Sequence, residues 1–135
     1  MNRDVVLNKI ETIERCVKRV NEVYQDIDAH LQDFTKQDSI VLNVQRACEA
    51  CIDLAMHMVS EKRLGIPQTS RDAFDLLREH QLIDLSIATK MKAMIGFRNI
   101  AVHDYQALSL TILKEIVENH LNDFTEFARQ ALRAN

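Results

Sequence analysis

Three residues in the C-terminal half of the chain, Arg98, His103 and Tyr105, could together cut a phosphodiester bond without a metal ion. An arginine holds a phosphate through a planar fork of charged N–H donors. A histidine exchanges a proton near neutral pH, so it can act as a general acid or a general base. All three fall within a segment that is otherwise patterned as helix. Whether they act together depends on the elements that position them.

The spacing of Arg98 and His103 brings them together only if the helix frays or ends between them. Five residues of a regular helix rotate about 500°, which leaves the two side chains roughly 140° apart. Gly96 before the pair and the polar residues 104–106 after it allow this, and His103 would then lie at the helix end with Arg98 one turn back. Tyr105 would then share the same cleft. The alternative is structural: a helix-terminal histidine favoured by the dipole, and an Arg98–Asn99 pair that caps or solvates a loop.

The other histidines carry no local pattern that marks a site. His30, His57, His80 and His120 all compete with His103, and we expect His120 to be a partly exposed surface residue. Asp53 and His57 are spaced to share one face of a helix, so the pair could position a proton carrier. A structural hydrogen bond on the helix surface or in the core is the more common role of such a pair.

Composition indicates one helical domain spanning residues 1–135. The chain is 47% hydrophobic, which is enough for a core, and it has only two glycines and one proline, which leaves room for few turns. Its net charge of −3 excludes a globally basic nucleic-acid-binding protein. Any RNA binding would use few phosphate contacts or a local patch built by oligomerisation.

The three cysteines, Cys16, Cys48 and Cys51, are expected in the core. Cys48 and Cys51 form a C-x-x-C, but neither a second C-x-x-C nor a histidine pair follows, so a zinc or redox site lacks partners. The odd cysteine count and the absence of a signal peptide predict a cytoplasmic protein. No apolar run approaches the ~20 residues of a membrane span, and no phosphate-binding loop, dinucleotide fingerprint or serine-hydrolase motif occurs. We therefore expect no metal and no cofactor.

Apolar periodicity predicts four main helices and a short one. The first shows a narrow seam of apolar residues alternately four and three apart. That seam comprises Val6, Ile10, Ile13, Val17, Val20, Tyr24, Ile27, Leu31 and Phe34. A second helix is predicted over 39–64, with Asp38 as N-cap and Gly65 and Pro67 after its end.

The remaining helices have similar start signals. Thr69–Ser70 can cap a short third helix, Asp84 a fourth, and Ser109 a last one that continues to about Leu132. These elements predict an all-α, up-and-down bundle.

The segment Arg98-Asn-Ile-Ala-Val-His-Asp-Tyr105 resembles the HEPN domain family, and within it the HepT toxins of HepT/MntA toxin–antitoxin pairs. The R-x4-H-x-Y motif is matched in full, and residues 96–105 match the wider pattern around it. Residues 45–57 resemble the family's second helix and residues 71–77 its short middle helix. The resemblance therefore covers nearly the whole chain.

The resemblance implies a two-fold dimer with the motifs of both subunits in one cleft, acting as a metal-independent endoribonuclease. Arg98 would bind the scissile phosphate, and His103 would act as acid or base on the ribose 2′-OH and the leaving oxygen. The products would be a 2′,3′-cyclic phosphate and a 5′-OH. Asn99 would orient His103 or the phosphate, and Asp53 and His57 would support the site. RNA is the expected substrate; no DNA and no membrane are expected.

The resemblance also implies a cognate minimal nucleotidyltransferase as antitoxin, which transfers AMP from ATP to Tyr105 and so blocks the anion site beside Arg98. Two alternatives remain open. The chain could be a non-catalytic partner or nucleotide-binding subunit of a nucleotidyltransferase, or a structural helical dimer whose motif only caps a helix.

Overall fold

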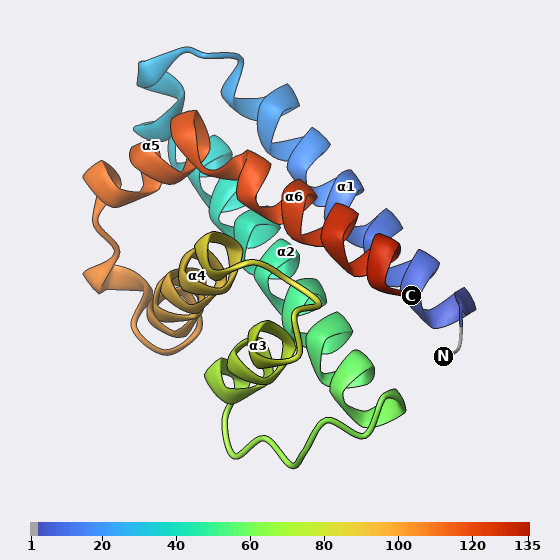
Figure 1. Cartoon of the computed structure of the whole chain (residues 1–135). Helices are drawn as coiled ribbons and strands as arrows, with labels where there is room; N and C mark the ends of the chain where they lie inside the picture. The colour runs from blue at the N-terminus through green and yellow to red at the C-terminus, as the bar shows by residue number, and fades with distance from the viewer. Residues whose placement is uncertain (1–2) are drawn as a thin grey trace.

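The computed structural model describes residues 3–135, and within them every regular element is a helix (Figure 1). The predicted all-α class is confirmed. In chain order the elements are α1 (Arg3–Tyr24), η1 (Asp28–Leu31), α2 (Phe34–Glu61), α3 (Ser70–Glu79), α4 (Leu85–His103), η2 (Tyr105–Ala107), α5 (Leu110–Asn119) and α6 (Leu121–Ala134). The elements η1 and η2 are short 3-10 turns.

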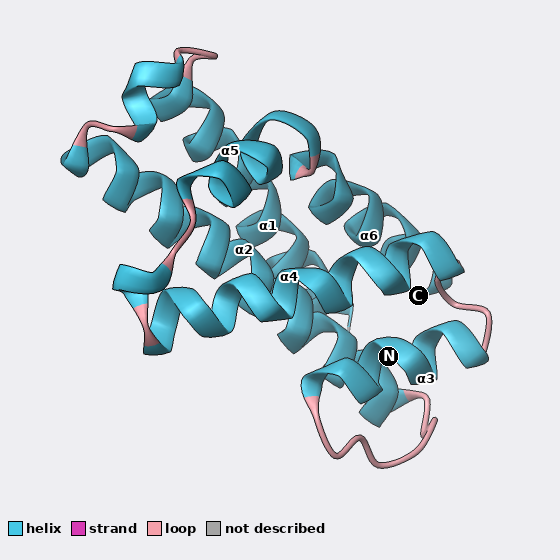
Figure 2. Ribbon diagram, turned by 90° about the vertical axis from the view of Figure 1, so that its left-hand side faces the viewer, coloured by secondary structure: helices cyan, strands magenta, loops and turns pink. Residues whose placement is uncertain are grey.

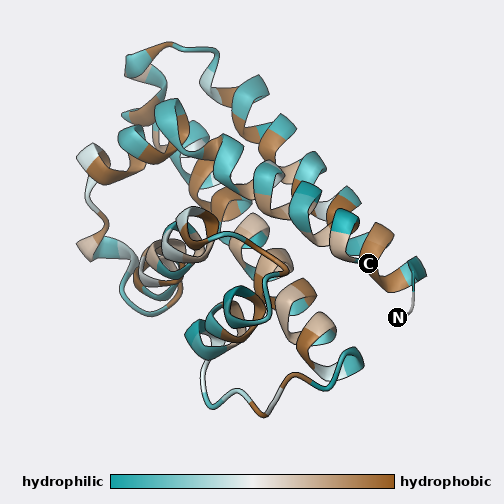
Figure 3. Ribbon diagram, in the orientation of Figure 1, coloured by the Kyte–Doolittle hydropathy of each residue, from teal (hydrophilic) through white to brown (hydrophobic). Residues whose placement is uncertain are grey.

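The core forms where α1, α2 and α6 run side by side and α4 crosses them (Figures 1 and 2). Short loops join these helices, and α3 packs between the end of α2 and the start of α4. The hydrophobic residues gather where the helices face one another (Figure 3). Phe74 of α3 and Phe127 of α6 meet edge to face, with ring centroids 5.4 Å apart. This contact ties α3 to the main bundle.

Helix α1 is shorter than the apolar seam predicted. It ends at Tyr24, because Gln25 and Asp26 adopt φ values of 55° and 56° and turn the chain out of the helix. Of the residues predicted to continue the seam, Leu31 is buried, but Phe34 is 78% exposed and begins α2. The seam therefore ends at the turn.

Helix α2 begins five residues earlier than predicted. Its N-cap is Asp33, whose carboxylate accepts a hydrogen bond of 3.1 Å from the Lys36 backbone N–H. Asp38 was expected in that role but lies inside the helix, where its carboxylate is free for another partner. The predicted end at Leu64 is also too late, since the last helical residue is Glu61 and Arg63 has a φ of 55°.

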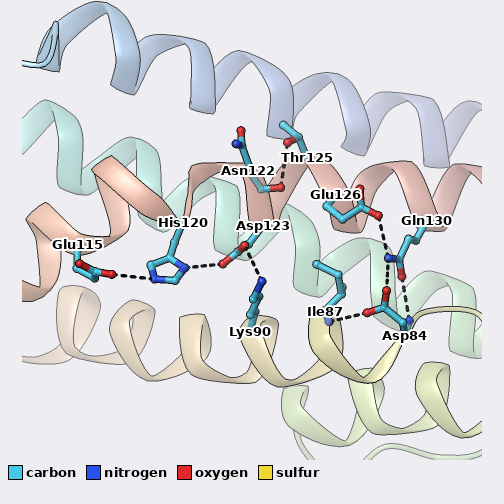
Figure 4. Close-up of polar contacts among 10 residues, drawn as sticks. All are labelled: Asp84, Ile87, Lys90, Glu115, His120, Asn122, Asp123, Thr125, Glu126 and Gln130. Carbon is cyan, nitrogen blue, oxygen red and sulfur yellow. Dashed lines mark hydrogen bonds and ion pairs between the residues drawn. The ribbon is translucent and has the colours of Figure 1, made fainter.

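Three of the predicted caps are confirmed. Thr69 and Asp72 form a reciprocal capping box at the start of α3, and Asp84 and Ser109 cap α4 and α5 through their side chains. Asp84 also accepts a hydrogen bond from Gln130, a buried residue of α6 (Figure 4).

The predicted last helix is two helices that meet at His120. The His120 ring lies 3.3 Å from Glu115 and 2.9 Å from the buried carboxylate of Asp123, so it bridges α5 and α6 (Figure 4). Lys90 of α4 approaches the same carboxylate at 3.7 Å. The His120 side chain is about one-third exposed, as expected for this residue.

Cys16, Cys48 and Cys51 are buried and unpaired, so their predicted place in the core is confirmed. Burial raises the pKa of the Cys48 and Cys51 thiols above the ordinary value. No helix within residues 3–135 combines the length and the apolarity that crossing a membrane requires.

Candidate functional site

Arg98 projects from α4 and is held by a carboxylate of α2. Its Nε and Nη2 donate to Oε2 of Glu49 at 3.1 and 2.9 Å, and its Nη1 donates to Asn99 Oδ1 at 3.3 Å. About 29% of the Arg98 side chain is exposed, so the guanidinium is fixed in place yet still accessible. A charged fork fixed in this way is suited to bind a phosphate.

Arg98 lines a cleft of about 550 Å³ between α2, the start of α3 and α4. The other lining residues are Glu49, Ile52, Asp53, Thr69, Ser70, Arg71, Ile95 and Asn99. The cleft thus contains two arginines and two carboxylates. Of the residues predicted to support the site, Asn99 and Asp53 lie here and His57 does not.

His103 does not join Arg98 in this cleft. Helix α4 continues without a break to His103, and the Asp104 N–H closes its last turn on Ile100 O at 2.9 Å. The helix thus ends at His103, as the sequence predicts, but it does not fray between Arg98 and His103, so the condition for their convergence within one chain is not met. On the unbroken helix the two side chains stay roughly 140° apart. The His103 side chain is exposed at the end of α4.

Tyr105 also lies outside the Arg98 cleft, contrary to expectation. It begins η2, and its hydroxyl donates a hydrogen bond to Asp38 Oδ1 in α2. Partial burial, and after it the hydrogen bond to Asp38, raise the pKa of Tyr105 to about 12. Its side chain lines a separate groove of about 310 Å³ together with Phe34 and Asp38.

Asp53 and His57 do not contact each other. Asp53 pairs with Lys9 of α1 at 3.1 Å. His57 Nε2 is buried and lies 4.0 Å from Glu61, which is too long for a hydrogen bond, and no other described residue provides a partner. The pair is therefore not a proton relay in this structure.

The remaining histidines have local structural contacts. The His30 ring reaches the carbonyl oxygens of Val23 and Tyr24 at the end of α1, and the His80 ring reaches that of Leu76 at the end of α3.

The sequence pattern missed two carboxylates that hold motif residues. Glu49 lies 49 positions before Arg98, and Asp38 lies 67 positions before Tyr105. For Asp38 the sequence predicts only a role as a helix cap. Their helical positions were predictable, but the pairing of α2 with α4 and η2 brings them to the motif, and no local signal in the sequence indicates that pairing.

Comparison with known proteins identifies the family. The family model described as "Ribonuclease HepT-like" matches residues 13–131. The chain belongs to the HepT-like family. The resemblance inferred from the motif is thereby confirmed.

Individual HepT-like relatives extend the match over nearly the whole chain. The protein described as "mRNA nuclease HepT" of Shewanella oneidensis is 53% identical over 92% of this chain and 93% of its own length. The "tRNA nuclease HepT" of Aphanizomenon flos-aquae is 23% identical over 93% of this chain and 86% of its own length. A solved structure described as a tri-AMPylated Shewanella oneidensis HEPN toxin in complex with MNT antitoxin superposes with a TM-score of 0.92. It is 51% identical, and the match covers 100% of both chains.

Proposed function

We propose that this chain is the endoribonuclease toxin of a toxin–antitoxin pair, and that its antitoxin is a minimal nucleotidyltransferase that silences it by adenylylating Tyr105. The observation that carries the proposal is the 53% identity to an mRNA nuclease over 92% of the chain. The intact Arg98, His103 and Tyr105 fit the same activity. With an RNA substrate of this kind, the protein would act in the cytoplasm.

Arg98 would bind the scissile phosphate and stabilise the charge that develops on it in the transition state. In binding, the phosphate would compete with Glu49 for the guanidinium or share its N–H donors. Asn99 accepts from Arg98 and so helps to orient the fork. Asp53 lines the cleft and would act through the negative charge of its carboxylate. His57 is a weaker candidate for supporting the site, because it lies outside the cleft.

His103 would move the protons of the reaction. The ribose 2′-oxygen attacks phosphorus, its proton passes to one imidazole, and the 5′-oxygen leaves with a proton from a second imidazole. The products are a 2′,3′-cyclic phosphate and a 5′-OH. A single chain does not bring Arg98 and His103 together, so the proposal requires a two-fold homodimer in which His103 of a second copy approaches the Arg98 cleft.

The regulatory half of the proposal rests on the relatives. The Shewanella toxin is described as tri-AMPylated in complex with its antitoxin, and a structure at 50% identity to this chain is described as a toxin–antitoxin with AMP-PNP. Tyr105 is 39% exposed, so an enzyme could reach its hydroxyl.

A non-catalytic partner subunit is the second candidate function. The observation that favours it is the contact with Glu49, which compensates the charge of Arg98 before any phosphate arrives. This candidate predicts antitoxin binding and adenylylation without RNA cleavage.

RNA cleavage by the purified chain separates the two functions. Unmodified protein is incubated with mRNA in the presence of a metal chelator, beside the variants Arg98→Ala and His103→Ala. The matched control is His80→Ala, which removes an exposed histidine at the end of α3. We expect cleavage by wild type and by the control, with cyclic phosphate ends, and a loss of at least about 100-fold in both motif variants. An inert wild-type protein that still binds its antitoxin would instead support the partner-subunit function.

A further inference from the structure

The carboxylate of Asp38 is bonded to the very oxygen that would be modified. The Tyr105 hydroxyl donates to Asp38 Oδ1, across 67 positions of sequence. Asp38 is not the N-cap of α2, because Asp33 has that role, so helix capping does not explain the position of the Asp38 carboxylate. Both residues are exposed, and an open groove of about 310 Å³ lies beside them. A nucleotide held by a second protein could therefore reach the phenol oxygen.

We propose that Asp38 is the general base for adenylylation of Tyr105, so that the modified chain and not the transferring enzyme supplies the proton acceptor. This inference rests on the proposed function, since it assigns a residue to that same modification.

The step balances with ATP as the co-substrate. The Tyr105 Oη attacks the α-phosphorus, an O–P bond forms, and the bond from that phosphorus to the oxygen bridging to the β-phosphate breaks. Pyrophosphate leaves with the electron pair. The hydroxyl proton passes to Asp38 Oδ1 as the O–P bond forms and is later lost to water. A carboxylate that accepts the proton of an attacking hydroxyl is an established solution in phosphoryl transfer.

The environment of Tyr105 makes a proton acceptor necessary. A tyrosine is already protonated at neutral pH, and partial burial and the neighbouring carboxylate raise the pKa of Tyr105 further, to about 12. The free phenolate is therefore scarce, and the nucleophile is the neutral phenol. Its oxygen becomes far more acidic once it bonds to phosphorus, so the proton then moves readily to a carboxylate already in place.

Among residues 3–135, Asp38 is the charged group that shifts the pKa of Tyr105. Asp104 precedes it at the end of α4, and its side chain makes no hydrogen bond or ion pair with any residue in the range 3–135. Asp104 therefore provides a matched control, because it carries the same carboxylate one position away in sequence without contacting the phenol oxygen.

The test measures the rate of AMP addition by intact mass, with the chain, its partner nucleotidyltransferase and ATP. The variants are Asp38→Asn, Asp38→Glu, Asp104→Asn and Tyr105→Phe. Asparagine keeps an oxygen that accepts the Tyr105 hydrogen bond but cannot take up the proton. We expect Asp38→Asn to lower the rate constant at saturating partner by about 100-fold. The partner concentration for half-maximal rate and the thermal midpoint should not change, Asp38→Glu should recover part of the rate, and Asp104→Asn should match wild type.

Three results would overturn the inference. An Asp38→Asn rate within about threefold of wild type would show that another group takes the proton. Equal losses in Asp38→Asn and Asp104→Asn, or a loss that appears only as weaker partner binding, would show a general charge effect on docking. No mass gain on wild type would overturn the proposed regulation itself, which is a distinct outcome because the first two require a modified wild-type chain. If Asp38→Asn does not fold, Asp38→Glu carries the test: a reduced but measurable rate would support a role that depends on the position of one carboxylate, and a rate unchanged from wild type would contradict it.

Discussion

Arg98 and His103 lie on one unbroken helix and face in different directions. Helix α4 runs from Leu85 to His103, and the Arg98 guanidinium is bonded to α2, whereas the His103 ring is exposed at the helix end. A single copy of the chain therefore does not place both groups on one phosphate.

This divergence predicts complementation between two inactive variants. In a mixed dimer of Arg98→Ala and His103→Ala subunits, one cleft would receive a wild-type arginine from one chain and a wild-type histidine from the other. Because this cleft has one imidazole where the wild-type reaction would use two, purified mixed dimers should cleave RNA faster than either parent variant but at less than half of the wild-type rate. The measurement is cleavage by co-expressed, doubly tagged and purified mixed dimers.

Each variant purified alone is the control for that experiment, together with the double variant Arg98→Ala/His103→Ala paired with wild type. Mixed dimers as inactive as their parents would contradict a site that two chains share.

Glu49 is predicted to weaken RNA binding while it positions Arg98. Its carboxylate lies 2.9 Å from Arg98 Nη2, so it offsets the charge that a phosphate would meet. In a His103→Ala background, which leaves RNA uncut, Glu49→Gln should tighten RNA binding by about 0.5–1 kcal/mol, a partly exposed pair being worth no more. Glu14→Gln on the exposed face of α1 is the matched control. Unchanged or weaker binding of Glu49→Gln would count against a phosphate site at Arg98.

The thiols of Cys48 and Cys51 should be unreactive in the folded protein. Both are almost completely buried, and desolvation raises their pKa, so the reactive thiolate is suppressed at neutral pH. A colourimetric thiol reagent should react with them only after denaturant unfolds the chain. Fast reaction or a reversible Cys48–Cys51 disulfide in the native protein would revive the redox interpretation of the C-x-x-C.

Glu126 should give α6 a stabilising contact that is lost in acid. Hydrogen bonds from Arg129 and Gln130 lower the pKa of Glu126 from 4.5 to about 2. A lowered folded-state pKa means that its stabilisation is present above the unfolded-state value and disappears as the pH falls from 4.5 towards 2. Thermal midpoints at pH 6 and pH 3 should therefore differ less for Glu126→Gln than for wild type. Glu22→Gln, an exposed carboxylate of α1, should behave as wild type; identical pH dependence in all three proteins would contradict the role of Glu126.

The parts of the fold that could be predicted are those encoded locally. Thr69, Asp84 and Ser109 start their helices because a side-chain cap needs only the backbone three residues on. The ends of α1 and α5 were missed for the opposite reason. Apolar residues continue in helical register through Ile27 and through Leu121. The apolar pattern therefore gives no sign of the turns after α1 and after α5, which depend on tertiary contacts.

In the candidate site, too, the local features could be predicted and the tertiary contacts could not. The motif located Arg98, His103 and Tyr105, but the partners Glu49 and Asp38 belong to a distant helix, and only the packing of α4 and η2 on α2 selects them. The spacing within the motif predicts one shared cleft. In the structure α4 is unbroken to His103, so Arg98 lies in one cleft and Tyr105 lies in a separate groove.

Helix α2 connects the Arg98 cleft and the Tyr105 groove and fixes the distance between them. Asp38 and Glu49 are eleven residues apart, which is three helical turns plus about 20°, so they lie on one face with a rise of about 16 Å between them. A first nucleotide joined to the Tyr105 oxygen would begin near Asp38. Arg98 lies near Glu49, at the other end of this stretch of α2. Nucleotides added at Tyr105 would therefore have to extend along α2 over this rise before they could reach Arg98.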